Sequence, residues 1–169
     1  MIAVEIKPHV FHKSRDLLSR PESWQWAACA ALWARVLALA SPGREKWPEF
    51  FDTVREAFSL AMLRCTNPEE FSRSESLIIR FDNFDIEDDG SAEWEFIVDF
   101  VTMIAPAVDG QDIGACLEIA LRSYLEGIKN VLSNGYAAAY DGVIRYDDAM
   151  KQLAVDPEWS RAVDFIRAL

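Results

Sequence analysis

The fold is decided by residues 21–43, which read PESWQWAACAALWARVLALASPG. Proline suits the first turn of a helix, where its missing N–H is not needed, and the carboxylate of Glu22 faces the positive end of the helix dipole. The stretch Trp24–Ala40 is apolar with two exceptions, and the Ser-Pro-Gly that follows is a stop signal. We therefore predict a helix over 22–40 that lies in the core.

The same proline–glutamate signal recurs three more times along the chain, at Pro48-Glu49, Pro68-Glu69 and Pro157-Glu158. Asn67 and Asp156 precede two of these pairs and are good N-cap residues. With the apolar periodicity of the remaining segments, these starts predict helices over 22–40, 48–64, 68–76, 92–105, 111–133, 146–154 and 157–168.

The signals that end these helices are also local. Pro106 limits the helix over 92–105, and Asn134-Gly135 is typical of a left-handed C-cap after 133. The segment Ser76–Phe84 is a poor helix by its sequence. Strand-like alternation is confined to Ile2, Val4 and Ile6, which is too short for a sheet. The sequence predicts a single all-α domain over 1–169, a bundle of about seven helices with at most a short N-terminal strand.

Composition excludes several classes of function. The 169 residues carry a net charge of −11, and such a surface repels phosphate backbones and anionic lipids. We therefore expect neither a nucleic acid nor a membrane as partner. Three widely spaced cysteines, Cys29, Cys65 and Cys116, lie in apolar helical patterns. They predict buried reduced thiols and a cytoplasmic location, whereas the sequence leaves the oligomeric state open.

Two predicted helices are apolar nearly all round, 22–40 and 92–105, and each contains a few charges. Arg35 is the charged residue of the first, and Glu95 and Asp99 lie one turn apart on the second. A buried arginine without a partner destabilises a fold by roughly 3 to 5 kcal/mol. We therefore expect a buried pair between Arg35 and Asp99 or Glu95, the alternative being an Arg35 that reaches solvent.

The charges are distributed unevenly along the chain. From Phe81 to Leu121 there is no lysine or arginine but eleven acids, so this segment holds the whole net charge. Its densest part mixes carboxylates with aromatic side chains, a combination that can steer and then hold a cationic partner. The alternative is a solvated loop with its aromatic residues in the core. The residues that we expect to bind a partner are Asp82, Phe84, Asp85, Glu87, Asp88, Asp89, Glu93 and Trp94, with Ile86 as a further apolar anchor.

The same stretch partly fits a calcium loop. The residues from Asp85 to Glu93 place acidic and glycine positions as in an EF-hand, but Phe96 stands where the bidentate glutamate belongs. We therefore expect no resident metal and no cofactor. Ser91 is better explained as the N-cap of the helix over 92–105.

Catalytic motifs are scarce. His9 and His12 are the only histidines, so triads of the serine or cysteine type lack their usual base. Carboxylate chemistry stays open, since Glu95 with Asp99, or Glu118 facing them, could bind Mg²⁺ in a nucleotide hydrolase. Such a site would also need lysine or arginine for the substrate phosphates, and residues 81–121 contain none. We therefore favour a structural polar stripe for these acids and expect no catalytic residue.

Three segments resemble the YjaG-like helical proteins of bacteria. They are Leu18–Arg35, in which Glu22-Ser23-Trp24-Gln25 opens an alanine-rich helix, the helix over Glu49–Leu63, and the closing helix that begins Asp156-Pro157-Glu158-Trp159. The resemblance implies a helical fold and no particular activity. In size, charge and lack of catalytic groups, the chain also looks like the immunity proteins that neutralise polymorphic toxins.

These observations favour a non-catalytic acidic binding protein, an immunity-type inhibitor that neutralises a basic bacterial toxin by stoichiometric binding. Two alternatives stay open. One is a Mg²⁺-dependent helical hydrolase, and the other is a helical scaffold or regulatory subunit.

Overall fold

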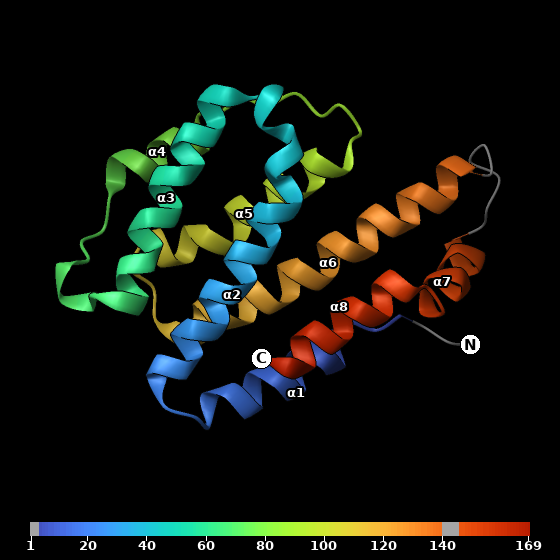
Figure 1. The fold of residues 1–169 in the computed structure, drawn as a ribbon, viewed down its shortest axis with the longest axis horizontal. Coiled ribbons are helices and arrows are strands. Elements are labelled where there is room, and N and C mark those ends of the chain that lie inside the picture. Colours follow the sequence, from blue (N-terminus) through green and yellow to red (C-terminus); the bar gives the residue numbers. More distant parts are fainter. Residues whose placement is uncertain (1–3, 140–145) are drawn as a thin grey trace.

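The computed structural model describes residues 4–139 and 146–169. All of the regular secondary structure in these residues is helical (Figure 1). No strand occurs in the described ranges, and Ile2 of the expected strand lies outside them. The elements in chain order are α1 (Lys7–Leu18), α2 (Glu22–Ala40), the 3₁₀ turn η1 (Ser41–Glu45), α3 (Pro48–Thr66), the 3₁₀ turn η2 (Pro68–Glu70), α4 (Glu75–Asp82), α5 (Ala92–Val108), α6 (Ile113–Ala139), α7 (Tyr146–Ala154) and α8 (Pro157–Ala168).

Helices α2, α5 and α6 form the centre of the bundle, and each packs against the other two. Helices α3 and α4 pack beside α5, whereas α1, α7 and α8 pack against α6. Figure 1 shows the resulting arrangement, with α3 and α4 at one end and α1, α7 and α8 at the other. The long helix α6 therefore connects the two groups.

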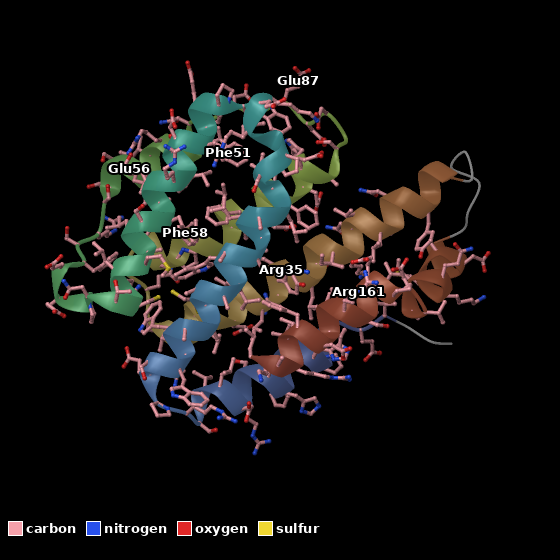
Figure 2. The ribbon with its side chains drawn as sticks, in the orientation of Figure 1. Arg35, Phe51, Glu56, Phe58, Glu87 and Arg161 are labelled. Atoms are coloured by element: carbon pink, nitrogen blue, oxygen red, sulfur yellow. The ribbon has the colours of Figure 1, made fainter. Side chains whose placement is uncertain are left out.

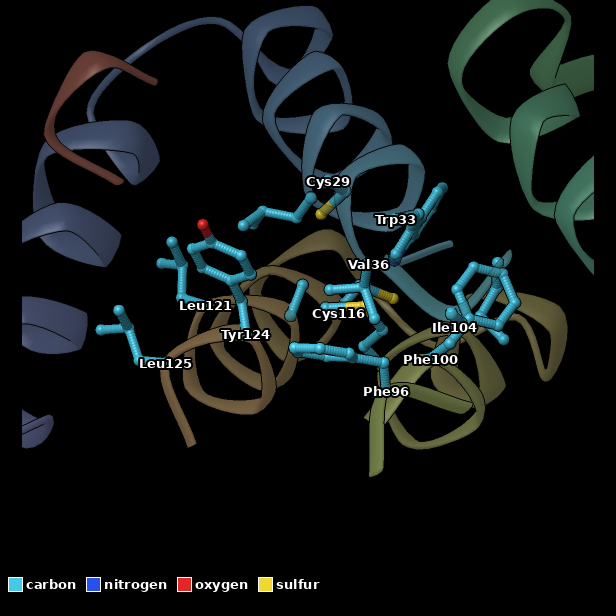
Figure 3. Packing of buried hydrophobic residues seen from close by; sticks show 14 of the residues in the cluster. Cys29, Trp33, Val36, Phe96, Phe100, Ile104, Cys116, Leu121, Tyr124 and Leu125 are labelled. Carbon is cyan, nitrogen blue, oxygen red and sulfur yellow. The ribbon is translucent and has the colours of Figure 1, made fainter. Parts of the chain in front are cut away.

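One hydrophobic core runs through all eight helices that the described residues form. At its centre, Trp33 and Val36 of α2 point toward Phe100 and Ile104 of α5 (Figure 3). The Trp33 side chain is fully buried. Burying a large apolar side chain stabilises a fold by about 1.5–3 kcal/mol, so this central contact explains why the apolar 22–40 stretch decides the architecture.

The predicted all-α class is confirmed, and several helix ends lie where the sequence places them. Helix α2 spans Glu22–Ala40, and α8 begins at Pro157. Ser91 accepts a hydrogen bond from the backbone N–H of Trp94 at 3.1 Å, as expected of an N-cap. Asp156 likewise accepts from the N–H of Glu158 at 2.7 Å.

The prediction for 68–76 is wrong. Pro68 opens only the short turn η2, Asn67 makes no capping hydrogen bond, and the chain is extended at Phe71. The extended backbone lets the Phe71 ring lie 5.0 Å from the guanidinium of Arg64. Helix α4 follows instead, within the segment that looked unsuitable, because Ser74 caps it by accepting from the N–H of Leu77.

Helix α1 is absent from the sequence prediction. Its apolar face is sparse, with Val10 and Leu17 as the buried residues of the helix. It is held by tertiary contacts with α6, α2 and α8. His9, for example, packs edge-on against Trp159 of α8, with 6.5 Å between ring centroids.

Two predicted helix ends are also wrong. Pro106 lies inside α5, which continues to Val108. Helix α6 passes through Asn134-Gly135 to Ala139, and Gly135 has no positive φ. Tyr136, one residue further on, donates a hydrogen bond to Asp156. This contact favours continued helix over the local C-cap signal.

Helix α2 is less buried than its composition indicates. One stripe of the helix is exposed and consists mainly of alanines together with Trp24 and Arg35. In the described residues, the span Glu22–Glu45 is the one helical segment that is long and apolar enough to cross a membrane by length and composition alone, and 44% of its most apolar 18 residues is buried. Its contacts with α5 and α6 fit a core helix of the bundle.

Candidate functional site

The candidate site is the acidic loop, residues 82–93, which joins α4 to α5. Its six carboxylates are those of Asp82, Asp85, Glu87, Asp88, Asp89 and Glu93, and all are exposed except that of Glu93, which is partly buried. Figure 2 shows Glu87 at the edge of the molecule, away from Arg35 and Arg161. The fold thus keeps six of the eleven acids of the anionic segment together on one surface.

The other five acids of that segment lie elsewhere. Asp109 pairs with Arg73, and Asp112 caps α6 by accepting from the N–H of Ala115. Glu95, Asp99 and Glu118 lie on other parts of α5 and α6. The anionic block of the sequence is therefore divided, and only the acidic loop keeps its concentration of charge.

Hydrogen bonds order the end of the acidic loop. Asp88 accepts from the N–H of Gly90 at 2.8 Å, and Asp89 accepts from the N–H of Ser91 at 3.0 Å. Gly90 has φ of +71°, a left-handed conformation that glycine adopts without the steric cost of a Cβ. These turns explain the Asp-Asp-Gly-Ser sequence more directly than calcium binding does, since they use the carboxylates to bind backbone.

Lys46 of the segment after η1 lies against the acidic loop. Its Nζ donates to Asp89 Oδ2 at 2.9 Å and lies 3.9 Å from Glu93 Oε2. Hydrogen bonds from Ser91 and then from Lys46 lower the pKa of Asp89 to about 2. Asp89 is therefore charged at every physiological pH, and the loop is fixed to the neighbouring helices through it.

Two of the apolar residues expected to hold a partner, Phe84 and Ile86, pack on the core. The Phe84 ring lies 4.5 Å from that of Phe50, between centroids. Trp94 is partly buried and donates its indole N–H to the carbonyl of Ile86 at 3.5 Å, and Ile86 packs on the core. All three side chains are partly buried, so part of their apolar surface is already removed from water, and a role for Phe84, Ile86 or Trp94 in holding a partner stays a prediction.

An apolar residue that the sequence analysis passed over lies beside the loop. Ile79 of α4 is 50% exposed, and it precedes Asp82 by one helical turn. Ser74 is the sequence signal that would have identified it, because an N-cap at Ser74 predicts a helix that begins at Glu75. In such a helix Leu77 lies on the buried face and Ile79 on the exposed face.

The predicted buried pair does not form. Arg35 is exposed, its guanidinium lies 5.6 Å from the centroid of the Phe165 ring, and it forms no salt bridge with Asp99 or Glu95. The reason is direction: the Arg35 side chain reaches toward Phe165 of α8, whereas Glu95 and Asp99 lie against Asn130 and Gly127 of α6. The alternative in which Arg35 reaches solvent is the one the fold adopts.

Asp99 is consequently a buried carboxyl without a cation. It is 9% exposed, and its Oδ2 has no hydrogen-bond partner among the described residues. Desolvation, with smaller effects from the nearby Glu95 and Glu126, raises the pKa of Asp99 to about 8. Glu95 accepts from the Asn130 amide at 2.8 Å. The two acids thus belong to the α5–α6 interface, where Asp99 is held largely in its neutral form.

The acids considered for Mg²⁺ binding are not assembled into one site. Glu118 is exposed and pairs with Arg122 on its own helix, whereas Glu95 is bound to Asn130. Within residues 4–139 and 146–169, no group of three histidine, cysteine or acidic side chains has the geometry to hold a metal ion.

The three cysteines form no disulfide in the described residues. Cys29 and Cys116 are buried and Cys65 is partly buried, and all three are free thiols. Burial raises the pKa of Cys65 and of Cys116 to about 11 in each case. Such thiols are poor nucleophiles at neutral pH.

Comparison with known proteins adds no assignment. No protein-family model, no curated protein and no solved structure matches this chain.

Proposed function

We propose that this protein acts in the cytoplasm by stoichiometric binding of a basic protein partner, as an immunity-type inhibitor of a bacterial toxin domain. The observation that carries the proposal is the acidic loop, where six carboxylates share one short segment and one lysine lies among them. Like charges held together destabilise a fold, and a cationic partner would relieve that repulsion.

The order of the acidic loop supports binding over mere solvation. The turns at Asp88 and Asp89, the Lys46 contact and the inward packing of Phe84 hold the loop against the bundle. A loop that is already ordered loses less conformational entropy on binding. Asp82, Asp85 and Glu87 take no part in these contacts, so their charges are available to a partner.

Exposed Ile79 supplies the apolar contact that the inward-facing aromatic residues do not. It lies on α4 immediately before the acidic loop. Interfaces commonly combine an apolar centre with a charged rim. We therefore place Ile79 at the centre of the proposed contact and the carboxylates around it.

The test is a pull-down from the native host with two matched variants. One variant carries Asp82→Asn, Asp85→Asn and Glu87→Gln, which remove three charges without touching the turns. The control carries Glu69→Gln, Glu70→Gln and Glu75→Gln, which remove three exposed charges from the segment around η2. We expect the loop variant to lose a basic partner that the wild type and the control retain, and the captured complex to weaken as salt is raised.

Two results would contradict the proposal. Equal recovery of the partner with all three proteins would show that the acidic loop is not the binding surface and would favour a scaffold role. Mg²⁺-dependent hydrolysis of a nucleotide, abolished by Glu95→Gln, would replace binding with catalysis.

A further inference from the structure

A second surface, independent of the acidic loop, lies between α1 and α6. It is a groove of about 670 Å³ whose α1 side includes Lys7, Phe11, Arg15 and Leu18 and whose α6 side consists of Glu118, Arg122 and Glu126. Phe11 is 59% exposed and Leu18 is 47% exposed. Two large apolar side chains thus face water in an open groove, which marks a contact surface.

The two helices run antiparallel along this groove. A Cβ on Gly114, at the start of α6, would lie 3.8 Å from Leu18 Cδ2 near the end of α1. The earlier residues of α1 then lie beside later residues of α6, since both helices rise about 1.5 Å per residue. This register places Arg15 across from Glu118 and Lys7 across from Glu126.

The walls of the groove carry opposite charges that do not meet within one chain. The α1 wall offers Lys7 and Arg15, and neither forms a salt bridge with a described residue. The α6 wall offers Glu118 and Glu126, with Arg122 between them paired to Glu118. The groove therefore separates a basic wall from an acidic wall across an apolar floor.

We infer that the groove is the interface of a homodimer in which a second copy of this chain covers it. A two-fold axis along the groove lays the α1 wall of each copy on the α6 wall of the other, so that Lys7 meets the partner's Glu126 and Arg15 meets the partner's Glu118. The same operation lays the exposed Phe11 and Leu18 of each copy on the α6 wall of the other. Such an isologous contact is self-complementary and closed.

The charges select this symmetry over the alternative. A two-fold axis across the groove would instead oppose the two basic α1 walls and the two acidic α6 walls, and opposition of like charges disfavours a complex. The acidic loop stays outside the dimer contact and remains open to a basic partner.

The test is sedimentation velocity at low and high protein concentration. We expect the wild type to form a species of twice the 19.2 kDa chain mass and Phe11→Glu to stay monomeric. Phe11 is exposed in the single chain, so the far-ultraviolet circular dichroism of this variant should match that of the wild type, whereas its thermal midpoint should not share the rise with protein concentration that a dimer shows.

A charge exchange makes the test specific. Lys7→Glu alone and Glu126→Lys alone should each weaken the dimer about tenfold or more, because each creates two like-charge contacts per dimer. The combination of both changes should restore it, since each copy then offers the reversed pair. Arg44→Glu, an exposed reversal outside the groove, is the matched control and should leave dimerisation unchanged.

Three outcomes would overturn the inference. The wild type could be a monomer at every concentration, or the combined variant could dimerise as weakly as the single variants. The dimer could also be lost on neutralising Asp82, Asp85 and Glu87 but kept in Phe11→Glu. The last outcome would indicate a head-to-tail contact through the acidic loop. None of these outcomes determines whether a basic partner is captured in the pull-down. The dimer and the proposed function can therefore be disproved independently of each other.

Discussion

Gly127 of α6 lies directly against the carboxyl group of Asp99 of α5. A Cβ at residue 127 would overlap Asp99 Oδ2 and would lie 2.9 Å from Asp99 Cγ. The absence of a side chain at Gly127 is therefore what allows the buried carboxyl to fit between the two helices. The close contact with Asp99 in turn explains why glycine occupies position 127.

The first prediction is a double-mutant cycle on this pair. Gly127→Ala should destabilise the fold by about 1–3 kcal/mol through overpacking, although alanine favours helix. Asp99→Ala removes the overlapping atoms and leaves only the Asp99 Cβ, 3.6 Å from the new methyl group. The double variant should therefore be more stable than the sum of the single effects by about 1 kcal/mol or more. Urea unfolding measures all four proteins, and additive effects would show that the two residues are not in contact.

The second prediction concerns pH. The folded protein keeps Asp99 protonated up to about pH 8, whereas the carboxyl of the unfolded chain loses its proton near its ordinary pKa of 3.8. The unfolded state thus binds fewer protons across this window, so the free energy of unfolding falls as pH rises from about 4 to about 8. Asp99→Asn removes this contribution.

The measurement compares the free energy of unfolding in urea of the wild type and of Asp99→Asn at several pH values. The contributions of His9 and of other groups that both proteins share cancel in the difference. The variant should gain at least about 1 kcal/mol relative to the wild type between about pH 5 and about pH 8. A constant difference between the two proteins would mean that Asp99 titrates normally.

The third prediction concerns Lys46. Lys46→Met removes the contact with Asp89 and Glu93, so the acidic loop should exchange its backbone amide hydrogens faster around Gly90 and Ser91. Exposed ion pairs add little to global stability, so the thermal midpoint should stay the same. Hydrogen exchange measured by mass spectrometry checks both points, with Arg44→Met as control. Unchanged exchange would indicate that the turns alone hold the loop.

The fourth prediction follows from the exposed Arg35. Arg35→Met should reduce stability by no more than about 1 kcal/mol, which is the range of an exposed cation–π contact such as that with Phe165. A buried ion pair would have produced a loss of about 3–5 kcal/mol. Chemical unfolding distinguishes the two, and a loss in the larger range would show that Arg35 does pair with a buried acid.

Local signals predicted the parts of the fold that local chemistry controls. Pro21-Glu22 begins α2, Ser91 caps α5 and Asp156 caps α8, because each of these signals acts through hydrogen bonds within one turn. Helix α1 escaped prediction since its stability comes from α6 and α8, which are distant in sequence. The helix end predicted at Asn134-Gly135 was wrong for the same reason. The hydrogen bond from Tyr136 to Asp156, which is distant in sequence, outweighs a local stop signal.

The candidate site was only partly predictable. The charge of the acidic loop is a property of the sequence, and its exposure follows from the cost of burying carboxylates. Whether Phe84 and Trp94 face water depends on Phe50 and on the course of the chain after α4, which periodicity in a short loop does not specify. The direction of Arg35 depended in the same way on where α8 packs.

The position of α1 between α6 and α8 also bears on how the chain is made. Lys13 donates to the backbone carbonyl of Arg167 at 3.0 Å, so the first helix is held by the last. On the ribosome, α1 is synthesised long before α6 and α8, so Val10 and Leu17, its buried residues, lack the helices that cover them until those helices have been made. Slow emergence of the final helices should then prolong the time during which the nascent chain needs a chaperone.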